Sequence, residues 1–178
     1  DLVLPLAKAL RDALEKTGKY TVVMTRDTDI FLSLKARVAV GRRSKADLFI
    51  SLHADSAPDS GVRGASVYTL SETASDKEAE ALAKSENQSD IIAGVDLTNE
   101  SDVVTSILID LAQRETKNNA VKFAQSLVPE LQKVGAVTHD GHKFAGFRVL
   151  KAPDVPSVLV EVGYVSNRYD ESVMVTNR

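Results

Sequence analysis

The chain contains no cysteine, and this absence excludes several kinds of chemistry. Without cysteine it forms no disulfide, holds no zinc through thiolates and uses no cysteine nucleophile. It also has no glycine-rich phosphate loop and no serine elbow of the G-x-S-x-G type. No apolar run approaches the roughly 20 residues that span a bilayer, so we expect no membrane span. The net charge of −3 gives no electrostatic footprint for nucleic acid.

The length and composition that remain fit a single globular domain. Of the 178 residues, 43% are hydrophobic and 26% charged, which is usual for a domain with a sizeable core. The patterns predict helices over 2–14, 33–44 and 120–134, strands over 20–25, 47–53, 65–70, 147–150 and 157–162, and a last helix capped by Ser166-Asn167. This alternation predicts an α/β fold, with a mostly parallel central sheet and helices on both faces.

Residues 72–112 interrupt this alternation. Acidic residues outnumber basic ones between Glu72 and Asn119, whereas the rest of the chain is mildly basic. A polar helical stretch over 75–84 and a shorter one over 86–94 precede an apolar stripe formed by Val103, Val104, Ile107, Leu108 and Leu111. We therefore predict a helical insertion between two core elements.

The strand predicted over 47–53 is the most informative segment. Its apolar residues occupy both alternating faces, as in a central strand that is covered on both sides. Open α/β sheets bind ligands just beyond the carboxyl ends of such strands, and His53 lies there with Asp55 two residues on. His53 is therefore placed for metal binding or proton transfer, or else it is a structural histidine that caps the strand end.

Glu161 is the second candidate, because it is a carboxylate in an otherwise apolar strand. Burial in such a strand favours the neutral form and raises the pKa of the carboxyl group. A raised pKa suits a general acid or base near neutral pH. The alternative is a buried glutamate that pairs with an arginine.

Four further residues are weaker candidates. His139 and His142 have a spacing that suits a metal, but they lie in a polar segment that we predict to be a solvated loop. Glu86 and Asp90 are four positions apart and share a face of the predicted helix. Their spacing alone predicts no more than a solvated acidic helix.

Three segments together resemble one family of enzymes. Ala36-Arg37 followed by Ala46-Asp47-Leu-Phe-Ile-Ser-Leu-His53-Ala-Asp55 resembles its central histidine motif, and Gly61-Val-Arg-Gly64 before Val67-Tyr68 resembles the turn that comes next. Its glutamate motif resembles Val149-Leu-Lys-Ala-Pro-Asp-Val-Pro156 leading into Val160-Glu-Val-Gly-Tyr-Val-Ser-Asn167. The family is that of the zinc-dependent N-acetylmuramoyl-L-alanine amidases of the amidase-3 type. The resemblance spans essentially the whole chain.

The resemblance implies that residues 1–178 form one amidase catalytic domain. In that family two histidines and one glutamate hold zinc, and a second glutamate is catalytic. His53 matches the second histidine, and Glu161 matches the catalytic glutamate. We expect the other two ligands upstream of Asp1, in a strand and a helix start that this segment lacks, so this segment alone should bind zinc poorly. The implied reaction is zinc-assisted hydrolysis of the amide between N-acetylmuramic acid and the L-alanine of peptidoglycan.

Residues 72–112 resemble the regulatory insertion of the cell-division amidases of Gram-negative bacteria. In those enzymes a helix occludes the active site until an activator with a LytM-type domain displaces it. The resemblance implies that residues 86–94 are the blocking segment and that Glu86 takes a zinc position as an inhibitory ligand, with Asp90 as the alternative. The stripe that begins at Val103 is then either the activator's docking helix or ordinary core packing. We expect a periplasmic enzyme that is monomeric.

Two other functions fit the same residues. One is a non-catalytic module that binds peptidoglycan or regulates its hydrolysis while keeping the fold. The other is a zinc peptidase that acts on the stem peptide alone. Metal analysis separates the first from an amidase, and analysis of the reaction products separates the second.

Overall fold

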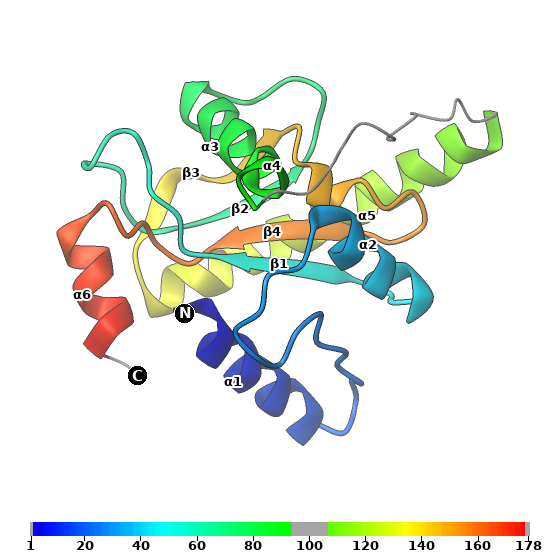
Figure 1. The fold of residues 1–178 in the computed structure, drawn as a ribbon, viewed down its shortest axis with the longest axis horizontal. Coiled ribbons are helices and arrows are strands. Elements are labelled where there is room, and N and C mark those ends of the chain that lie inside the picture. Colours follow the sequence, from blue (N-terminus) through cyan, green and yellow to red (C-terminus); the bar gives the residue numbers. More distant parts are fainter. Residues whose placement is uncertain (1, 94–106, 177–178) are drawn as a thin grey trace.

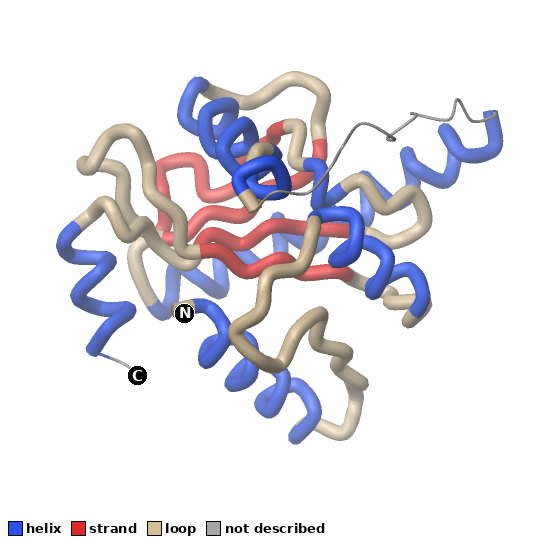
Figure 2. Tube along the Cα trace, in the orientation of Figure 1, coloured by secondary structure: helices blue, strands red, loops and turns tan. Residues whose placement is uncertain are grey.

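A four-stranded sheet crosses the middle of the molecule, with helices on both sides (Figure 1, Figure 2). The computed structural model describes residues 2–93 and 107–176. The strands lie in the order β1 (Phe49–His53), β4 (Ser157–Glu161), β2 (Ala65–Leu70) and β3 (Val137–Ala145). β1 and β4 pair in parallel, as do β2 and β3, whereas β2 and β4 are antiparallel. The predicted α/β fold is confirmed, and the sheet is mixed.

Helices cover both faces of the sheet because its strands feed two apolar clusters. Three elements lie on one face: α2 (Leu34–Arg43), α3 (Lys77–Asn87) and the 3₁₀ turn η1 (Arg148–Leu150). The other face is covered by α5 (Ile107–Val134), whose Ala120 and Ala124 are buried with Val158 and Val160 of β4. The alternation of side chains along β4 therefore serves two separate cores.

Several helices begin and end where local sequence signals predict. Gly18 follows α1 (Val3–Lys16), adopts a left-handed φ of 68° and donates its N–H to Glu15 O at 2.9 Å. Ser33 caps α2, since its Oγ accepts from Ala36 N at 3.2 Å. Asn167 caps α6 (Arg168–Thr176) by accepting from the N–H of the second and third helical residues.

Residues 20–25 do not form a strand, so that prediction is wrong. Tyr20 and Val23 are 58% and 56% exposed, and no described strand pairs with this segment. Aromatic and β-branched residues favour a strand only where a partner strand and a half-buried surface exist. This segment is half-buried at Val22, Met24 and Thr25 but has no partner strand among the described residues, so its composition does not determine its conformation.

We predicted a loop for the polar segment around His139 and His142, and this prediction is also wrong. The segment is part of β3. β3 pairs only with β2 within the described sheet and therefore forms its edge. An edge strand has one side open to solvent, so it tolerates polar and charged side chains. The pairing is irregular near Gly141, whose φ is 58°.

Residues 147–150 form no strand either. The chain turns here into η1, where Leu150 N donates to Phe147 O at 3.2 Å. Phe147, Val149 and Leu150 are nevertheless buried. A turn that points neighbouring apolar side chains into one core has the same composition as a buried strand, which explains the wrong prediction.

The predicted insertion, residues 72–112, contains α3, α4 (Ser89–Ile92) and the beginning of α5. α3 has an apolar face that the sequence did not make obvious, because Ala79, Leu82 and Ala83 are buried. α5 continues without a break across position 112. The apolar stripe that begins at Val103 lies outside the residues whose side chains the structure describes. A regulatory role for this region stays a prediction.

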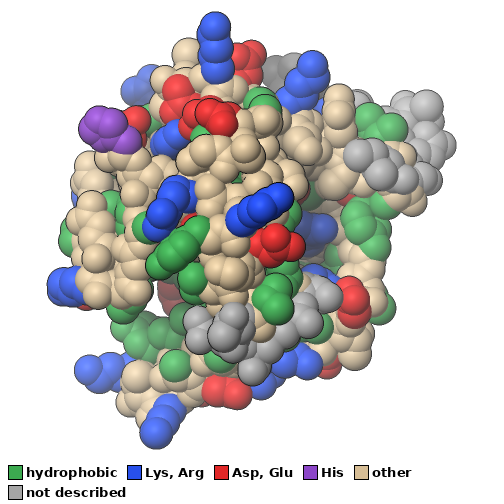
Figure 3. Space-filling model, turned by 90° about the vertical axis from the view of Figure 1, so that its left-hand side faces the viewer, with side chains coloured by type: hydrophobic (Ala, Val, Ile, Leu, Met, Phe, Trp, Pro, Cys, Tyr) green, Lys and Arg blue, Asp and Glu red, His purple; other side chains and the backbone are tan. Residues whose placement is uncertain are grey.

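The described surface is of mixed character. Over residues 2–93 and 107–176, no helix combines the length and apolarity that crossing a membrane requires. On the face shown in Figure 3, Lys and Arg side chains are interspersed with Asp and Glu, and hydrophobic side chains lie among them. Such interspersion fits the small net charge of −3.

Candidate metal and catalytic site

His53 and Glu161 lie side by side at the carboxyl ends of two neighbouring strands. β1 and β4 run parallel, and their register places His53 opposite Glu161. Both side chains are buried, His53 with 7% of its surface exposed and Glu161 with none. Ligands of such sheets bind at the carboxyl ends of parallel strands. The fold therefore brings together the two residues that the sequence singled out.

The imidazole of His53 is held from both sides. Its Nε2 lies 2.8 Å from Oγ of Ser51, which precedes it by two residues and so shares its face of β1. Its Nδ1 faces two carboxylates, at 3.3 Å from Asp55 Oδ2 and 3.4 Å from Glu86 Oε2. One ring nitrogen thus faces a hydroxyl group, and the other faces the carboxylates of Asp55 and Glu86, which we call the acidic cluster.

Glu86 reaches this cluster from the last turn of α3. α3 and α4 lie over the sheet on the same side as α2 (Figure 1). One ligand atom from each of His53, Asp55 and Glu86 lies within 4.8 Å of the other two. Glu86 is separated from His53 in sequence by β2 and most of α3, so only the tertiary fold creates this group.

The donor atoms of the cluster fit a divalent metal ion. Asp55 Oδ2 and Glu161 Oε2 are buried side-chain oxygens that accept no hydrogen bond. Buried polar atoms normally have a partner, so each such atom calls for an explanation. One imidazole nitrogen and two carboxylate oxygens are ligands that zinc takes in proteins. His53, Asp55 and Glu86 could therefore hold such an ion, with Glu161 beside it.

Glu161 is strongly biased toward its neutral form. Complete burial raises the pKa of its carboxyl group well above the usual range, and the neighbouring Asp55 carboxylate raises it further. A hydrogen bond from Asp55 N to Glu161 Oε1, at 2.7 Å, lowers the pKa and so partly opposes these effects. Glu86 adds a smaller increase. The protonation state of Glu161 therefore depends on the charges that surround its carboxyl group.

Glu86 experiences opposing influences. Burial raises the pKa of its carboxyl group, and Asp55 adds to that increase, whereas His53 and Arg37 lower it. Arg37 lies on α2, where its Nε donates to Leu32 O at 2.9 Å and its guanidinium stacks 5.9 Å from the Phe31 ring. Its positive charge favours the ionised form of the Glu86 carboxyl group.

The other candidates from the sequence lie elsewhere. Asp90 is buried, but its Oδ1 accepts from Leu34 N at 2.9 Å, outside the acidic cluster. The side chain of His139 is fully exposed. His142 Nε2 lies 2.9 Å from Thr69 Oγ1, and burial lowers the pKa of the ring. The two histidines thus share no metal site with each other in the described structure.

The sequence contains one further signal for this site, which the predictions above did not use. Ser51, His53 and Asp55 are spaced two residues apart, so an extended chain points all three side chains the same way. That spacing makes Ser51 a predictable partner for the ring of His53 and Asp55 a predictable member of the cluster. The sequence gives no comparable signal for Arg37 as a neighbour of Glu86.

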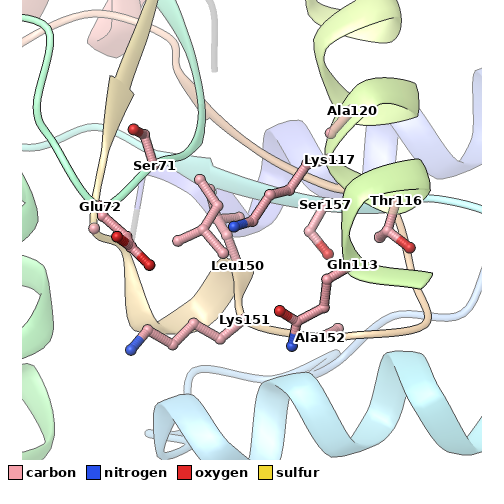
Figure 4. Close-up of a pocket in the computed structure, with 12 residues that line it drawn as sticks. Ser71, Glu72, Gln113, Thr116, Lys117, Ala120, Leu150, Lys151, Ala152 and Ser157 are labelled. Atoms are coloured by element: carbon pink, nitrogen blue, oxygen red, sulfur yellow. The ribbon is translucent and has the colours of Figure 1, made fainter. Parts of the chain in front are cut away.

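A separate cavity of about 460 Å³ opens between α5 and the chain around η1 (Figure 4). Gln113, Thr116 and Lys117 line it from α5, and Lys151 lines it from the chain that follows η1. Ser157, at the start of β4, also lines this cavity, whereas Glu161 ends that strand. The cavity contains no member of the acidic cluster.

Comparison with known sequences identifies related proteins. The family model described as N-acetylmuramoyl-L-alanine amidase (Amidase_3) matches residues 1–178. The chain is 39% identical over 177 residues to the N-acetylmuramoyl-L-alanine amidase AmiC of Escherichia coli O6:H1, covering 99% of this chain and 42% of that protein. It is 35% identical over 176 residues to AmiA of Escherichia coli K12, covering 98% of this chain and 61% of that protein. The chain thus spans about two fifths of the length of AmiC and about three fifths of the length of AmiA.

Solved structures show the same fold. The catalytic domain of CwlV, an N-acetylmuramoyl-L-alanine amidase from Bacillus (Paenibacillus) polymyxa var. colistinus, has a TM-score of 0.60 and 25% identity, covering 97% of this chain and 71% of that one. Ami1 from Mycobacterium smegmatis has a TM-score of 0.61 and 19% identity, with 97% and 66% coverage. At that lower identity the likeness concerns the fold alone.

Proposed function

The chain belongs to the N-acetylmuramoyl-L-alanine amidase family, and from that premise we propose that it is the catalytic domain of a zinc-dependent peptidoglycan amidase that Glu86 holds closed. The reaction is hydrolysis of the amide that joins the lactyl group of N-acetylmuramic acid to L-alanine of the stem peptide. The observation that carries the proposal is the Glu86 carboxylate, 3.4 Å from Nδ1 of His53. A carboxylate is a natural plug for a cationic metal site.

His53 is the proposed zinc ligand, and Glu86 is the proposed inhibitory ligand. The buried Oδ2 of Asp55 supports the same location, because it faces His53 Nδ1 at 3.3 Å and accepts no hydrogen bond. When bound, zinc polarises the scissile carbonyl and lowers the pKa of a water molecule. Ser51 fixes the ring of His53 from behind, so that Nδ1 keeps its direction toward the cluster.

Glu161 is the proposed general base. Its Oε1 is fixed by the hydrogen bond from Asp55 N, and its Oε2 has no hydrogen-bond partner and is free to take a proton. In the reaction Glu161 accepts the proton of the attacking water and passes it to the leaving amine of L-alanine. The rigid pairing of β1 with β4 keeps this carboxylate next to His53.

The plug opposes this role in two ways. Glu86 occupies the space in front of His53 Nδ1, and its carboxylate adds to the effects that raise the pKa of Glu161. A protonated Glu161 cannot accept the proton of water, so the plug favours the inactive form of the base. Removal of Glu86 opens the site and removes one of the negative charges that bias Glu161 toward its neutral form.

The resemblance to cell-division amidases supplies the cellular setting of the proposal. The enzyme acts in the periplasm on peptidoglycan, as a monomer. An activator with a LytM-type domain displaces α3 and α4 and so withdraws Glu86 from His53. The acidic character of residues 72–112 suits this role, since the segment must supply a carboxylate to a metal site.

The test is hydrolysis of labelled peptidoglycan by the full-length protein without an activator. We expect Glu86→Ala to raise this basal rate by about tenfold or more, because the blocked state loses its inhibitory contact. Glu80→Ala is the matched control, since Glu80 is an exposed carboxylate on the same helix. Glu161→Gln in the same background should reduce the rate by roughly 10²–10⁴-fold while the zinc content stays the same.

The products separate the competing functions. An amidase releases stem peptides that begin with L-alanine, whereas a peptidase releases fragments cut within the stem. A basal rate that is equal in Glu86→Ala and the unmodified protein contradicts the plug. A protein that contains no zinc and hydrolyses nothing, with or without the activator, is a non-catalytic module.

A further inference from the structure

The segment that carries Glu86 is fixed by two other side chains, neither of which belongs to the acidic cluster. We call residues 86–92, the end of α3 together with α4, the plug segment. Asn87 bonds the chain between β3 and η1, and Asp90 bonds the first residue of α2. Nothing in the proposed catalytic roles uses these contacts.

Asn87 satisfies both ends of its amide on one short stretch of backbone. Its Nδ2 donates to Gly146 O at 2.8 Å, and its Oδ1 accepts from Arg148 N at 2.8 Å. The stretch between them is fixed, because Phe147 is fully buried in the core. Asn87 therefore binds a fixed part of the domain through two hydrogen bonds of good geometry.

Asp90 makes the second attachment in a more buried place. Only 3% of its surface is exposed, and its Oδ1 accepts from Leu34 N at 2.9 Å. Leu34 begins α2 and is itself buried, in the same core cluster as Val149 and Leu150 of η1. Asn87 and Asp90 therefore attach the plug segment to two elements that pack together.

Among the side chains that the structure describes in residues 86–92, no apolar one is buried. The buried apolar side chains of α3 are Ala79, Leu82 and Ala83, all of which precede Glu86. In α4, Ile91 is 60% exposed. Among the described side chains beyond Glu86, Asn87 and Asp90 therefore provide the contacts that fix this segment to the rest of the domain.

We propose that Asn87 and Asp90 are the latch of the closed state, which the activator must break in order to withdraw Glu86. The inference rests on the proposed function, in which Glu86 blocks the site. Loss of the two hydrogen bonds of Asn87 shifts the equilibrium between closed and open states by about tenfold. Asp90 acts on the same equilibrium because its bond to α2 exists only while the plug segment is in place.

The experiment measures basal hydrolysis by the full-length protein with Asn87→Ala or Asp90→Ala. Each variant should raise the rate without activator by about tenfold, and saturating activator should bring all variants to one common rate. Gln88→Ala is the matched control, because Gln88 is exposed on the same turn and should leave both rates unchanged. Asn87→Asp keeps the acceptor for Arg148 N but places a carboxylate against Gly146 O, so it should release the plug without shortening the side chain.

Hydrogen exchange of the plug segment provides a readout that does not require catalysis. Asn87→Ala, Asn87→Asp and Asp90→Ala should each lose protection over residues 86–92, while β1 and β4 keep theirs. If Glu86→Ala raises the basal rate and all three variants match Gln88→Ala in rate and exchange, the latch is refuted and the plug stands. If Glu86→Ala fails to raise the rate, the proposed function itself is refuted, and a loss of protection in the three variants then leaves the attachment intact as a structural finding.

Discussion

Asp170 joins the chain ahead of β2 to the chain that follows β4, and its removal should be costly. It is buried in the first turn of α6, and its Oδ2 accepts from Gly64 N at 2.7 Å and from Tyr164 N at 3.1 Å. Tyr164 lies three residues after the end of β4, and Gly64 directly precedes β2. One carboxylate oxygen thus satisfies two buried backbone donors near the strand end that carries Glu161.

The expected effect of Asp170→Ala follows from those two donors. A buried N–H that loses its partner costs about 1–3 kcal/mol, and entry of water into the vacated space recovers part of that cost. We therefore expect the free energy of unfolding to fall by about 3 kcal/mol. For a chain of this size, that corresponds to a drop of roughly 6–12 °C in melting temperature. Asp170→Asn keeps an acceptor oxygen without the charge and should lose only about 1 kcal/mol.

Thermal and urea unfolding followed by circular dichroism measure these differences. The matched control is Glu171→Ala, because Glu171 is an exposed carboxylate in the same turn of α6 and should change stability little. An Asp170→Ala protein that is as stable as Glu171→Ala would refute the reasoning. It would mean that Gly64 N and Tyr164 N find other partners without strain.

Two further predictions concern stability. Gly64→Ala should destabilise the fold by more than about 2 kcal/mol in urea unfolding, because φ is +88° and a Cβ would lie 2.8 Å from a backbone carbonyl; Gly135→Ala, with open space around it, is the control. Burial raises the pKa of Asp76, but the N–H of Ala79 and the Lys143 ammonium outweigh it and lower the pKa overall. The stability from Asp76 is therefore present above its unfolded pKa of about 4 and is lost as the pH falls through the lower folded value. As the pH falls, the free energy of unfolding should decrease less in Lys143→Met than in the unmodified protein. An equal decrease in both proteins would contradict this assignment.

The sequence alone determined much of the framework. The caps at Ser33 and Asn167 and the stop at Gly18 act within one helical turn, so local composition was enough to predict them. The strands that end at His53 and Glu161 were predictable because most of the residues in each are apolar. Local patterns gave a wrong prediction for residues 20–25, which have strand composition but pair with no strand in the described part of the chain.

The tertiary structure alone decided which of these residues meet. The pairing of β1 with β4 places Glu161 beside His53, and the position of α3 over the sheet delivers Glu86 to the same ring nitrogen. Glu86 and Asp90 were indistinguishable on a helical wheel, yet one faces the acidic cluster and the other bonds the start of α2. The reason is physical: propensity and capping depend on neighbours along the chain, whereas these contacts depend on how separate apolar faces pack across it.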